Sequence, residues 1–581
     1  MQLRGLGGAR GPTLVLVSAV SIVAFVGLQT PAPGAGLASS VSSSSVLRVG
    51  TYHGIPGQFT SIQAAVDAAR PGDWILVGPG DHKEVTGRAP AGRSDLPAGV
   101  LVTTPGLHLR GMSRNAVLVD GTKPGSATCS NQLSDQSFGP GGASGAGPAG
   151  LNGIEVWKAD NVWVQNLTVC NYLHGSGSTG NEIWWNGGDG SAQIGGWGFN
   201  GSFLSATSTF YRDESTAAQY GIFSSNWSGG TWDHTYASNF NDSGYYIGAC
   251  QQVCNQTVDH AWSEYNALGY SGSNSGGQLV IENSQFDNNE DGFDTNSQNG
   301  DNPPPQDGAC PGNGISPITH THSCWVFMHN YVHDNNNPNV PALGSAAAGP
   351  VGTGLSLSGG RNDTVMGNVF EHNGAWGTIF VPYPDSGPPC TGGTQTGAAC
   401  LYDEYGDALI GNTYGKANGF FGNPTNGDFG AVNAVPGPTD CYSGNVEEGG
   451  GAVKSSPPNL EQMYPRCDGS TVPPNANALL ADEVACDSGS VSIGPVTGGT
   501  LCPPGAHYPR RTTVTMHPLP SALPSMPNPC AGVPVNPWCP TTHAAAGYHV
   551  VPGRGHGSGT GNEFALARRS RSAISRSTGA R

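Results

Sequence analysis

The stretch Ser275–Gly300 reads SGGQLVIENSQFDNNEDGFDTNSQNG and joins a strand-forming first half to a second half rich in acids. The first half mixes β-branched and polar residues in a short run, a pattern typical of a strand. The second half gathers Glu290, Asp291 and Asp294 around Gly292. Three carboxylates supply the oxygen ligands that a hard cation prefers, so the sequence predicts a calcium site there, with a solvated acidic turn as the alternative.

Turn glycines recur at the length of one solenoid coil. Gly269 and Gly292 lie 23 residues apart, and so do Gly354 and Gly377. A hydrophobic strand face that one coil cannot bury is buried when the next coil stacks on it. The period therefore predicts a stack of coils built from short strands.

Asparagines recur in pairs five residues apart, and we expect their side-chain amides to stack at the turns. Amides can hydrogen-bond along such a ladder from one coil to the next. We therefore give these residues a structural role. The pairs are Asn166 and Asn171, Asn283 and Asn288, Asn330 and Asn335, and Asn368 and Asn373, with His234 and Asn239 as a variant.

The composition favours an all-β protein. Charged residues make up 11% of the 581 residues, whereas the 90 glycines and 45 prolines far exceed average usage, so helices are disfavoured over most of the chain. The glycines follow no strict three-residue period, which excludes a collagen-like chain. Recurring Val, Ile, Phe and Trp clusters indicate a packed core.

The N-terminus has the pattern of a secretory signal peptide. Arg4 and Arg10 precede the apolar run Leu14–Leu28, and the small residues Gly36 to Ala38 offer a cleavage site. The run is shorter than the ~20 residues that span a membrane. We expect cleavage near residue 38, a secreted mature protein, and no membrane span after it.

Ser61 can cap a helix that ends before Pro71, and the apolar strand Trp74–Val77 follows. This succession resembles the N-terminal cap of right-handed parallel β-helix proteins of the pectin-lyase-like superfamily. The resemblance implies that a helix over Ser61–Arg70 covers the open end of the first coil. The expected order is a signal peptide (1–38), a Ser-rich leader (39–57), a right-handed parallel β-helix (58–435), a Pro/Cys-rich C-terminal region (436–551) and a disordered basic tail (552–581).

Fourteen cysteines in a secreted chain indicate disulfides, and the closely spaced pairs Cys250/Cys254, Cys310/Cys324 and Cys390/Cys400 would staple loops. The net charge of −17 argues against nucleic acid as a partner. We expect an extracellular polysaccharide as the partner and a monomeric protein.

The run Glu290–Asp294 resembles the acidic motif by which family-nine pectate lyases hold calcium. The stretch Gly352–Gly360 is similar to the strand that carries the catalytic lysine of that family, and here the lysine position is Ser356. A serine hydroxyl is too weak a base for β-elimination. The resemblance therefore implies a calcium-dependent lyase of a uronate polymer only if another residue replaces the lysine. Arg361 is our candidate for catalysis or for binding a substrate carboxylate, although arginine normally stays protonated.

Three alternatives stay open. A hydrolase would need paired carboxylates across a groove, which Asp287, Asp291, Asp294, Asp301 and Glu371 could supply. A zinc site could use His320, His322, Cys324, His329 and His333, although Cys324 is more simply explained by a disulfide. A binding solenoid without catalysis could stack sugar rings on aromatic side chains, the candidates being Trp184, Trp185, Tyr245, Tyr246 and above all Tyr270.

Overall fold

The computed structural model describes residues 44–142, 146–189, 191, 193–250, 253–299, 305–342, 349–386, 390–397, 399–415, 417–488 and 503–541. The expectations for the signal peptide, for Asp301 and for the basic tail lie outside these residues. None of the helices in the described ranges has the length and hydrophobicity of a membrane span.

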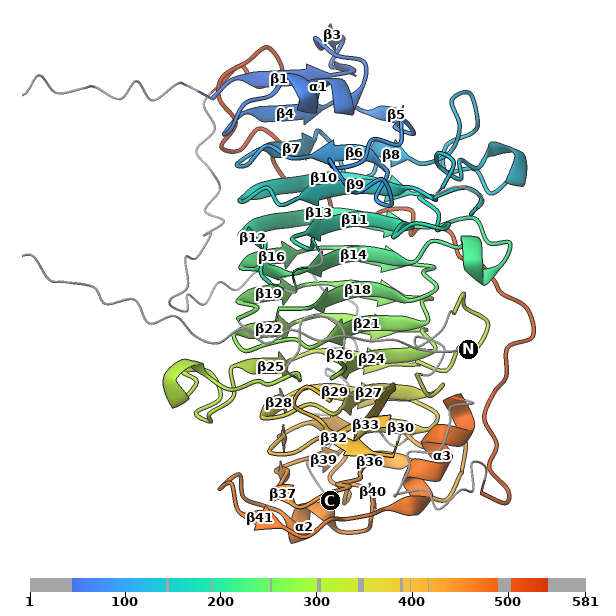
Figure 1. The fold of residues 1–581 in the computed structure, drawn as a ribbon, viewed down its shortest axis with the longest axis vertical. Coiled ribbons are helices and arrows are strands. Elements are labelled where there is room, and N and C mark those ends of the chain that lie inside the picture. Colours follow the sequence, from blue (N-terminus) through green and yellow to red (C-terminus); the bar gives the residue numbers. More distant parts are fainter. Residues whose placement is uncertain are drawn as a thin grey trace, which may run out of the picture. The chain divides into compact units, whose positions relative to one another are not determined.

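Parallel strands of successive coils pair with one another along the stack (Figure 1). They form a 21-stranded first sheet and an 11-stranded second sheet, and parallel strands joined by crossovers wind right-handed. The fold is the predicted right-handed parallel β-helix. The second sheet contains β6 (Ala98–Val102), β9 (Asn152–Trp157), β11 (Asn181–Asn186), β14 (Tyr220–Ser225), β18 (Ser243–Gly248), β21 (Leu268–Ser273), β24 (Asp291–Asn296), β27 (Thr353–Ser358), β30 (Trp376–Val381), β36 (Gly427–Ala431) and β40 (Ser455–Ser456).

The first sheet consists of two neighbouring files of strands, which β10 (Val162–Cys170) and β13 (Phe199–Thr207) join because each spans both. One file holds β1 (Val46–Val49), β4 (Trp74–Val77), β7 (His108–Gly111), β16 (Gly230–Asp233), β19 (Gln256–Asp259), β22 (Leu279–Glu282), β25 (Trp325–Met328), β28 (Asp363–Met366), β34 (Ala408–Ile410) and β38 (Cys441–Ser443). The other holds β5 (Gly80–Lys83), β8 (Val117–Asp120), β17 (Tyr236–Ser238), β20 (Trp262–Glu264), β23 (Gln285–Asp287), β26 (Tyr331–His333), β29 (Val369–Glu371), β35 (Thr413–Tyr414) and β39 (Val446–Glu447).

Several short helices and strands lie outside the two large sheets. Two short helices follow the last coils: α2 (Leu460–Met463) and α3 (Ala478–Ser488). The remaining strands are β2 (Thr51–Tyr52), β3 (Ile55–Pro56), β12 (Gly196–Trp197), β15 (Trp227–Ser228), β31 (Tyr383–Ser386), β32 (Thr394–Thr396), β33 (Ala399–Tyr402), β37 (Gly437–Pro438) and β41 (Thr471–Val472).

The predicted capping helix is present as α1 (Ile62–Ala68), and its N-cap is Ser61, whose hydroxyl accepts a hydrogen bond from the Ala64 amide. Its buried residues, among them Ile62 and Ala65, join the core of the coils. The ends of the β-helix differ from the prediction. β1 pairs with β4 inside the stretch expected to be a leader, and β40 pairs with β36 beyond residue 435.

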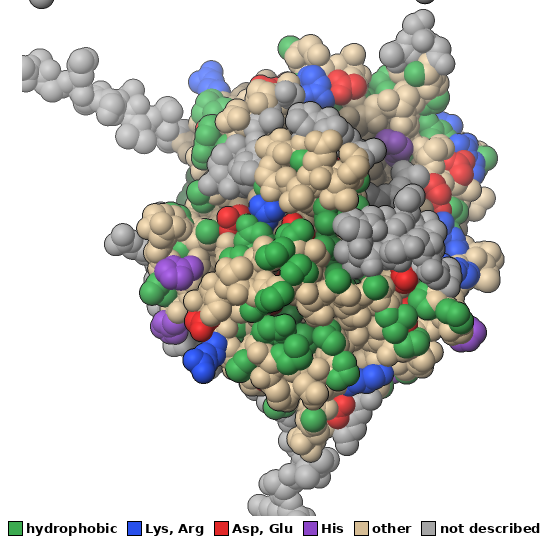
Figure 2. All heavy atoms as spheres, turned by 60° about the horizontal axis from the view of Figure 1, so that its bottom comes forward, with side chains coloured by type: hydrophobic (Ala, Val, Ile, Leu, Met, Phe, Trp, Pro, Cys, Tyr) green, Lys and Arg blue, Asp and Glu red, His purple; other side chains and the backbone are tan. Residues whose placement is uncertain are grey.

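At the opposite end of the stack, α2 lies against the core. Leu460 of α2 is 1% exposed and belongs to the core cluster, so α2 contributes to the C-terminal cap. Figure 2 looks onto this end and shows hydrophobic side chains gathered near the middle of the view. Phe420, Val446 and Met463 are among the exposed hydrophobic residues of this part of the chain.

Buried amides form two ladders at the turns. Asn330 donates to the side-chain oxygen of Asn368 at 3.2 Å, and Asn368 donates to Asn412 at 2.9 Å. Asn335 and Asn373 form the second ladder in the same way, at 3.2 Å. An amide carries both donor and acceptor, so identical side chains satisfy one another along the stack. The predicted ladder is confirmed for these four residues.

The register of the other asparagine pairs was wrong by one position. Asn283 and Asn288 have φ of 51° and 56°, and so take the left-handed conformation of the turn itself. The residue that follows Asn288, Asn289, is the one that enters the ladder, donating to Asn335 at 3.0 Å. Asparagine suits both positions, because it tolerates positive φ and also pairs with a copy of itself. Asn166, Asn171, His234 and Asn239 are likewise left-handed.

The recurring glycines explain the orientation of the second sheet. A Cβ on Gly292 would lie 2.5 Å from the Gly354 carbonyl oxygen and 2.6 Å from Asn335 Nδ2, so only glycine fits against the ladder. The strand pairing passes over this residue, and Gly292 and Phe293 both face the interior. Asp291 and Asp294 therefore lie on the same, outer face of β24.

The C-terminal region is a strap. After residue 503 the chain runs back along the stack toward the N-terminal coils (Figure 1). Cys530 and Cys539 form a disulfide at its far end and pack with Trp74 of β4. Successive contacts join Arg511 to Glu214, His517 to Tyr265, Met526 to Asn166 and Trp538 to Ile55.

All three predicted disulfides are confirmed. They link Cys250 to Cys254, Cys310 to Cys324, and Cys390 to Cys400.

Candidate functional site

The outer face of the second sheet carries one side chain per coil in a single file. In register from β11 to β24 these residues are Trp184, Phe223, Tyr246, Ser271 and Asp294. Coils stack about 4.8 Å apart, so Trp184 and Asp294 lie about 19 Å apart along the file. The face therefore has an aromatic half and an acidic half.

The aromatic half is a stacked platform. The rings of Trp184 and Phe223 stack at 4.7 Å with 5° between their planes, and Tyr246 meets Phe223 edge-on at 4.8 Å. Beside them, Arg93 and Lys158 each lie within 6 Å of the Trp157 ring, at 5.5 and 5.7 Å. Arg93 and Lys158 are paired with Asp95 and Asp189, so the stacked aromatic faces are the feature here that suits the rings of a glycan.

The acidic half is centred on Asp294. This half-buried carboxylate accepts hydrogen bonds from the hydroxyls of Ser356 and Ser358 on the next coil, the second at 3.0 Å. Asp291 is fully buried; one of its oxygens accepts from the Phe293 amide at 3.1 Å, and the other has no partner among the described residues. Two hydroxyl donors fix Asp294, whereas Asp291 keeps one oxygen unpaired.

The C-terminal region adds two charged groups next to this pair. Asp487 of α3 interacts electrostatically with Asp291 and with Glu290. Arg510 caps the C-terminal end of α3, where it donates to the carbonyl oxygens of Asp487 and Cys486. Helix α3 also covers the outer face of β30, where Leu480 and Ala481 pack on the residues that follow the file. The acidic half is thus the last open part of the face before α3 covers it.

Burial controls the protonation of these acids. It raises the pKa of Glu290 to about 8, with nearby Arg511 opposing the shift. Burial, and then the Asp294 charge, raise the pKa of Asp291 well above its usual range. Burial also raises the pKa of Asp294, but its hydrogen bonds from Ser356 and Ser358 oppose the shift. With a pKa of about 8, Glu290 is mostly protonated at neutral pH, whereas the two serine hydroxyls favour the ionised form of Asp294.

The predicted calcium ligands lie together but do not form a ready-made ion site. Among the described residues, three ligand atoms within 4.8 Å of one another occur in two groups, and Glu290, Asp291 and Asp294 do not form one of them. Ligands of one calcium ion lie 2.3–2.6 Å from it, so the oxygens must converge more closely than they do here. Calcium stays a prediction from the family resemblance, and we assign it no step.

Arg361 makes structural contacts. Its guanidinium donates to the carbonyl oxygens of Asp403 and Gly392, at 3.4 and 2.8 Å, and lies 4.9 Å from the Tyr405 ring. None of these partners belongs to the acidic half. Ser356, at the position of the family lysine, donates a hydrogen bond to Asp294.

Tyr270 does not fit the predicted sugar contact. Its ring is fully buried and stacks on Phe293 at 4.3 Å inside the coils. The aromatic candidates divide by face: Trp185 and Tyr245 are also core residues, whereas Trp184 and Tyr246 lie on the outer face. The physical reason is that Tyr245 and Tyr270 each follow an inward glycine, which shifts the strand alternation by one residue.

The hydrolase and zinc candidates are spread over the coils. Asp287 and Glu371 lie on the first sheet, whereas Asp291 and Asp294 lie on β24 of the second sheet. Cys324 is bonded to Cys310, which removes the thiolate that the zinc site needed.

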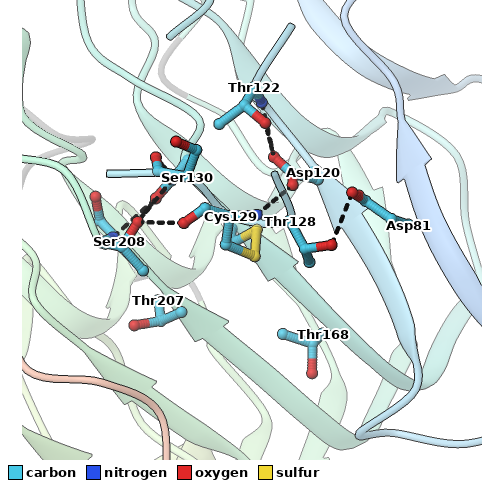
Figure 3. Close-up of a disulfide and its surroundings, with 12 residues drawn as sticks. Asp81, Asp120, Thr122, Thr128, Cys129, Ser130, Thr168, Thr207 and Ser208 are labelled. Atoms are coloured by element: carbon cyan, nitrogen blue, oxygen red, sulfur yellow. Dashed lines mark hydrogen bonds between the residues drawn. A yellow bond between two sulfur atoms is a disulfide. The ribbon is translucent and has the colours of Figure 1, made fainter. Parts of the chain in front are cut away.

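One of the two groups with metal-like spacing is Asp120, Cys129 and Cys170. Figure 3 shows that its cysteines form a disulfide and that the Cys129 amide donates to Asp120. Asp120 also accepts from Lys83 at 2.6 Å. Since the sulfur atoms are bonded to each other, we assign this group to the structure of the turn.

Comparison with known proteins gives a fold-level likeness only. No family model matches the chain, and no curated protein matches it in sequence. The A-module of the Azotobacter vinelandii mannuronan C-5 epimerase AlgE4 aligns at 12% identity and a TM-score of 0.38, covering 68% of this chain and 91% of its own. An alginate lyase from Paenibacillus sp. strain FPU-7 aligns at 11% identity and a TM-score of 0.30, covering 71% of this chain and 99% of its own. The tailspike of the E. coli bacteriophage HK620 aligns at 12% identity and a TM-score of 0.35, covering 69% of this chain and 58% of its own. At such values we draw no argument about function from these proteins.

Proposed function

We propose that the protein is a secreted glycan hydrolase that binds a polysaccharide along the outer face of its second sheet and cleaves it in the acidic half. The observation that carries the proposal is the single file that joins the stacked Trp184 and Phe223 rings to Asp294. A ligand that touches both ends must span about 19 Å, the reach of a chain of several sugar rings and not of one monosaccharide. The proposed substrate is therefore a polymer.

Glycoside hydrolysis requires two carboxyl groups in different protonation states. Glu290, whose pKa burial raises to about 8, is the proposed proton donor to the glycosidic oxygen. Asp294, which two serine hydroxyls hold, is the proposed base that takes a proton from the attacking water. Both residues are half-buried, whereas Asp291 between them is fully buried, and the charges of Asp294 and Glu290 add to the burial that raises its pKa.

Two observations favour hydrolysis over β-elimination. Elimination needs a base next to the uronate carboxylate, and the residue that contacts Asp294 at the family lysine position is a serine. It also needs a group that neutralises the carboxylate, and the acids here do not converge on an ion.

A second candidate function, glycan binding without turnover, is favoured by the same serine. An inactive relative of a lyase would keep its aromatic platform and lose its base.

One assay distinguishes hydrolysis, elimination and binding without turnover. The mature protein is incubated with neutral and uronate polysaccharides, and new reducing ends and the ultraviolet absorbance of unsaturated products are both measured. Hydrolysis gives reducing ends without absorbance, insensitive to a chelator and lost in Glu290→Gln and Asp294→Asn. Absorbance that needs calcium would establish the lyase instead, and binding without any product would establish the non-catalytic solenoid. Asp287→Asn, on the first sheet, is the matched control and keeps full activity.

A further inference from the structure

The bend between the two strand files of the first sheet carries one left-handed residue per coil. In successive coils these residues are Phe203, His234, His260 and Asn283, with φ of 53°, 53°, 53° and 51°. Identical backbone geometry at a rise of about 4.8 Å places their side chains above one another. The two middle coils use histidine where the next coil uses asparagine.

The rings stack in this order. Phe203 and His234 lie 4.9 Å apart with 20° between their planes, and His234 and His260 lie 4.7 Å apart with 11°. Each imidazole is fixed by the carboxylate that precedes it. His234 Nδ1 lies 2.6 Å from Asp233 Oδ1, and His260 Nδ1 lies 2.7 Å from Asp259 Oδ1.

The carboxylates form a parallel file beside the rings. Asp233 pairs in register with Asp259, and Asp259 with Glu282. Asn283 donates to Asp259 at 3.0 Å and so closes the lower end of the cluster, as Phe203 closes the upper end. Two imidazoles and three carboxylates thus share one edge of the β-helix.

We propose that Asp233, His234 and His260, with Asp259 beside them, bind a divalent transition-metal ion of the zinc type. One ligand atom from each of the first three lies within 4.8 Å of the other two. Nitrogen and oxygen ligands on one tetrahedral zinc are separated by about 3.3 Å, so side-chain rotations that shorten the present distances would bring them onto an ion. Imidazole with carboxylate suits zinc, cobalt or nickel, whereas calcium takes oxygen alone.

The histidines are already arranged as metal ligands usually are. A metal-bound histidine commonly gives its second ring nitrogen to a carboxylate, which sets the ring orientation. The Nδ1 contacts with Asp233 and Asp259 have this form and set the orientation of both rings. The side chains of His234 and His260 are 19% and 31% exposed, so an ion can reach them from solvent.

The test is calorimetric titration of the untagged mature protein with zinc chloride. We expect one site, and at least tenfold weaker binding in His234→Asn and in His260→Asn. Asparagine is the substitution of choice because the following coil carries it at this turn position with the same backbone. His329→Asn, at an exposed equivalent turn further along the stack, is the matched control and keeps wild-type affinity.

Several results would overturn the site. These results are no zinc binding by the wild type, wild-type affinity in both His234→Asn and His260→Asn, or a loss of affinity confined to His372→Asn. The last result would assign the ion to His333 and His372, which both contact Asp334. If a histidine variant melts early without metal, Asp233→Asn replaces it, and unchanged affinity there would also count against the site. Cobalt substitution gives an independent readout, because visible absorption bands of a cobalt–histidine complex must disappear in His260→Asn.

Discussion

Two groups of buried acids in this protein have similar composition and different surroundings. In the first-sheet turns Asp363, Asp407 and Asp440 stack on successive coils. Asp407 accepts a hydrogen bond from the Asp363 amide at 2.8 Å, and Asp440 accepts one from the Asp407 amide at 3.0 Å. Each of these two carboxylates thus ties its own coil to the backbone of the preceding coil.

The acids of the second sheet bond differently. Asp294 accepts from the side-chain hydroxyls of Ser356 and Ser358, and Asp291 accepts from the Phe293 amide of its own strand. Burial raises the pKa of Glu290, Asp291 and Asp294 and of Asp363, Asp407 and Asp440 alike, so a shifted pKa does not distinguish them. The hydrogen-bond partner does distinguish them: Asp407 and Asp440 accept from backbone amides of the preceding coil, which marks them as structural acids, whereas Asp294 accepts from side-chain hydroxyls on the outer face.

The largest expected effect is on turnover. Asp294→Asn keeps the shape of the side chain and its serine contacts but removes the proposed base, so the rate of glycan cleavage should fall on the order of 100-fold or more. The melting temperature should stay close to wild type. A large fall in melting temperature with the rate per folded molecule preserved would make Asp294 a structural acid after all.

Substitutions among the stacked acids Asp363, Asp407 and Asp440 should have the opposite effect, lowering stability and leaving turnover unchanged. Asp407→Ala leaves the buried Asp363 amide without its acceptor, which costs about 1–3 kcal/mol of the free energy of unfolding. Denaturant unfolding measures this loss. Asp407→Asn retains an oxygen acceptor and should unfold no more easily than wild type, and cleavage by folded protein should be unchanged in both variants.

A smaller effect is expected at the aromatic end of the file. Trp184→Ala removes the ring that stacks on Phe223, and oligosaccharide affinity should fall about tenfold while the rate at saturation holds. Phe286→Leu, in the core, is the control for general loosening of the coils. Equal affinity in Trp184→Ala and wild type would remove the platform from the proposal.

The smallest effect is a pH dependence of stability. Burial raises the pKa of Asp440 to about 6, and the pKa values of Asp363 and Asp407 lie well above their usual range. A folded-state pKa above the unfolded value of about 3.9 means that the folded state binds protons more tightly. These acids therefore stabilise the fold at low pH, and this stabilisation is lost as the pH rises from about 4 through 6 and beyond. The melting temperature should be lower at pH 7.5 than at pH 5.5, and Asp407→Asn should reduce the difference; an unchanged slope would contradict the assignment.

The fold could be predicted from the sequence because local sequence patterns determine it. The glycines recur at positions where a Cβ would clash with the adjacent coil, and Ser61 caps α1 because its hydroxyl reaches the first turn. Both depend on neighbours in the chain or on the adjacent coil, and the short disulfides were predictable for the same reason.

The candidate site was only partly predictable. The acids at Glu290, Asp291 and Asp294 lie in one short run, so the sequence could point to them. Asp487 joins them from almost two hundred residues away, which no local pattern indicates. The choice between the adjacent rings Tyr245 and Tyr246 depends on the inward glycine before them, and simple alternation does not include that shift.

The most direct test of the central claim is the mass of the products formed in water enriched in heavy oxygen. Hydrolysis by the carboxyl groups of the second sheet predicts a heavy-oxygen label on every new reducing end, formed by wild type and by Asp407→Asn and not by Asp294→Asn. Unlabelled products lighter by one water molecule would show elimination, and labelled products from Asp294→Asn at the wild-type rate would show that the reaction takes place elsewhere on the molecule.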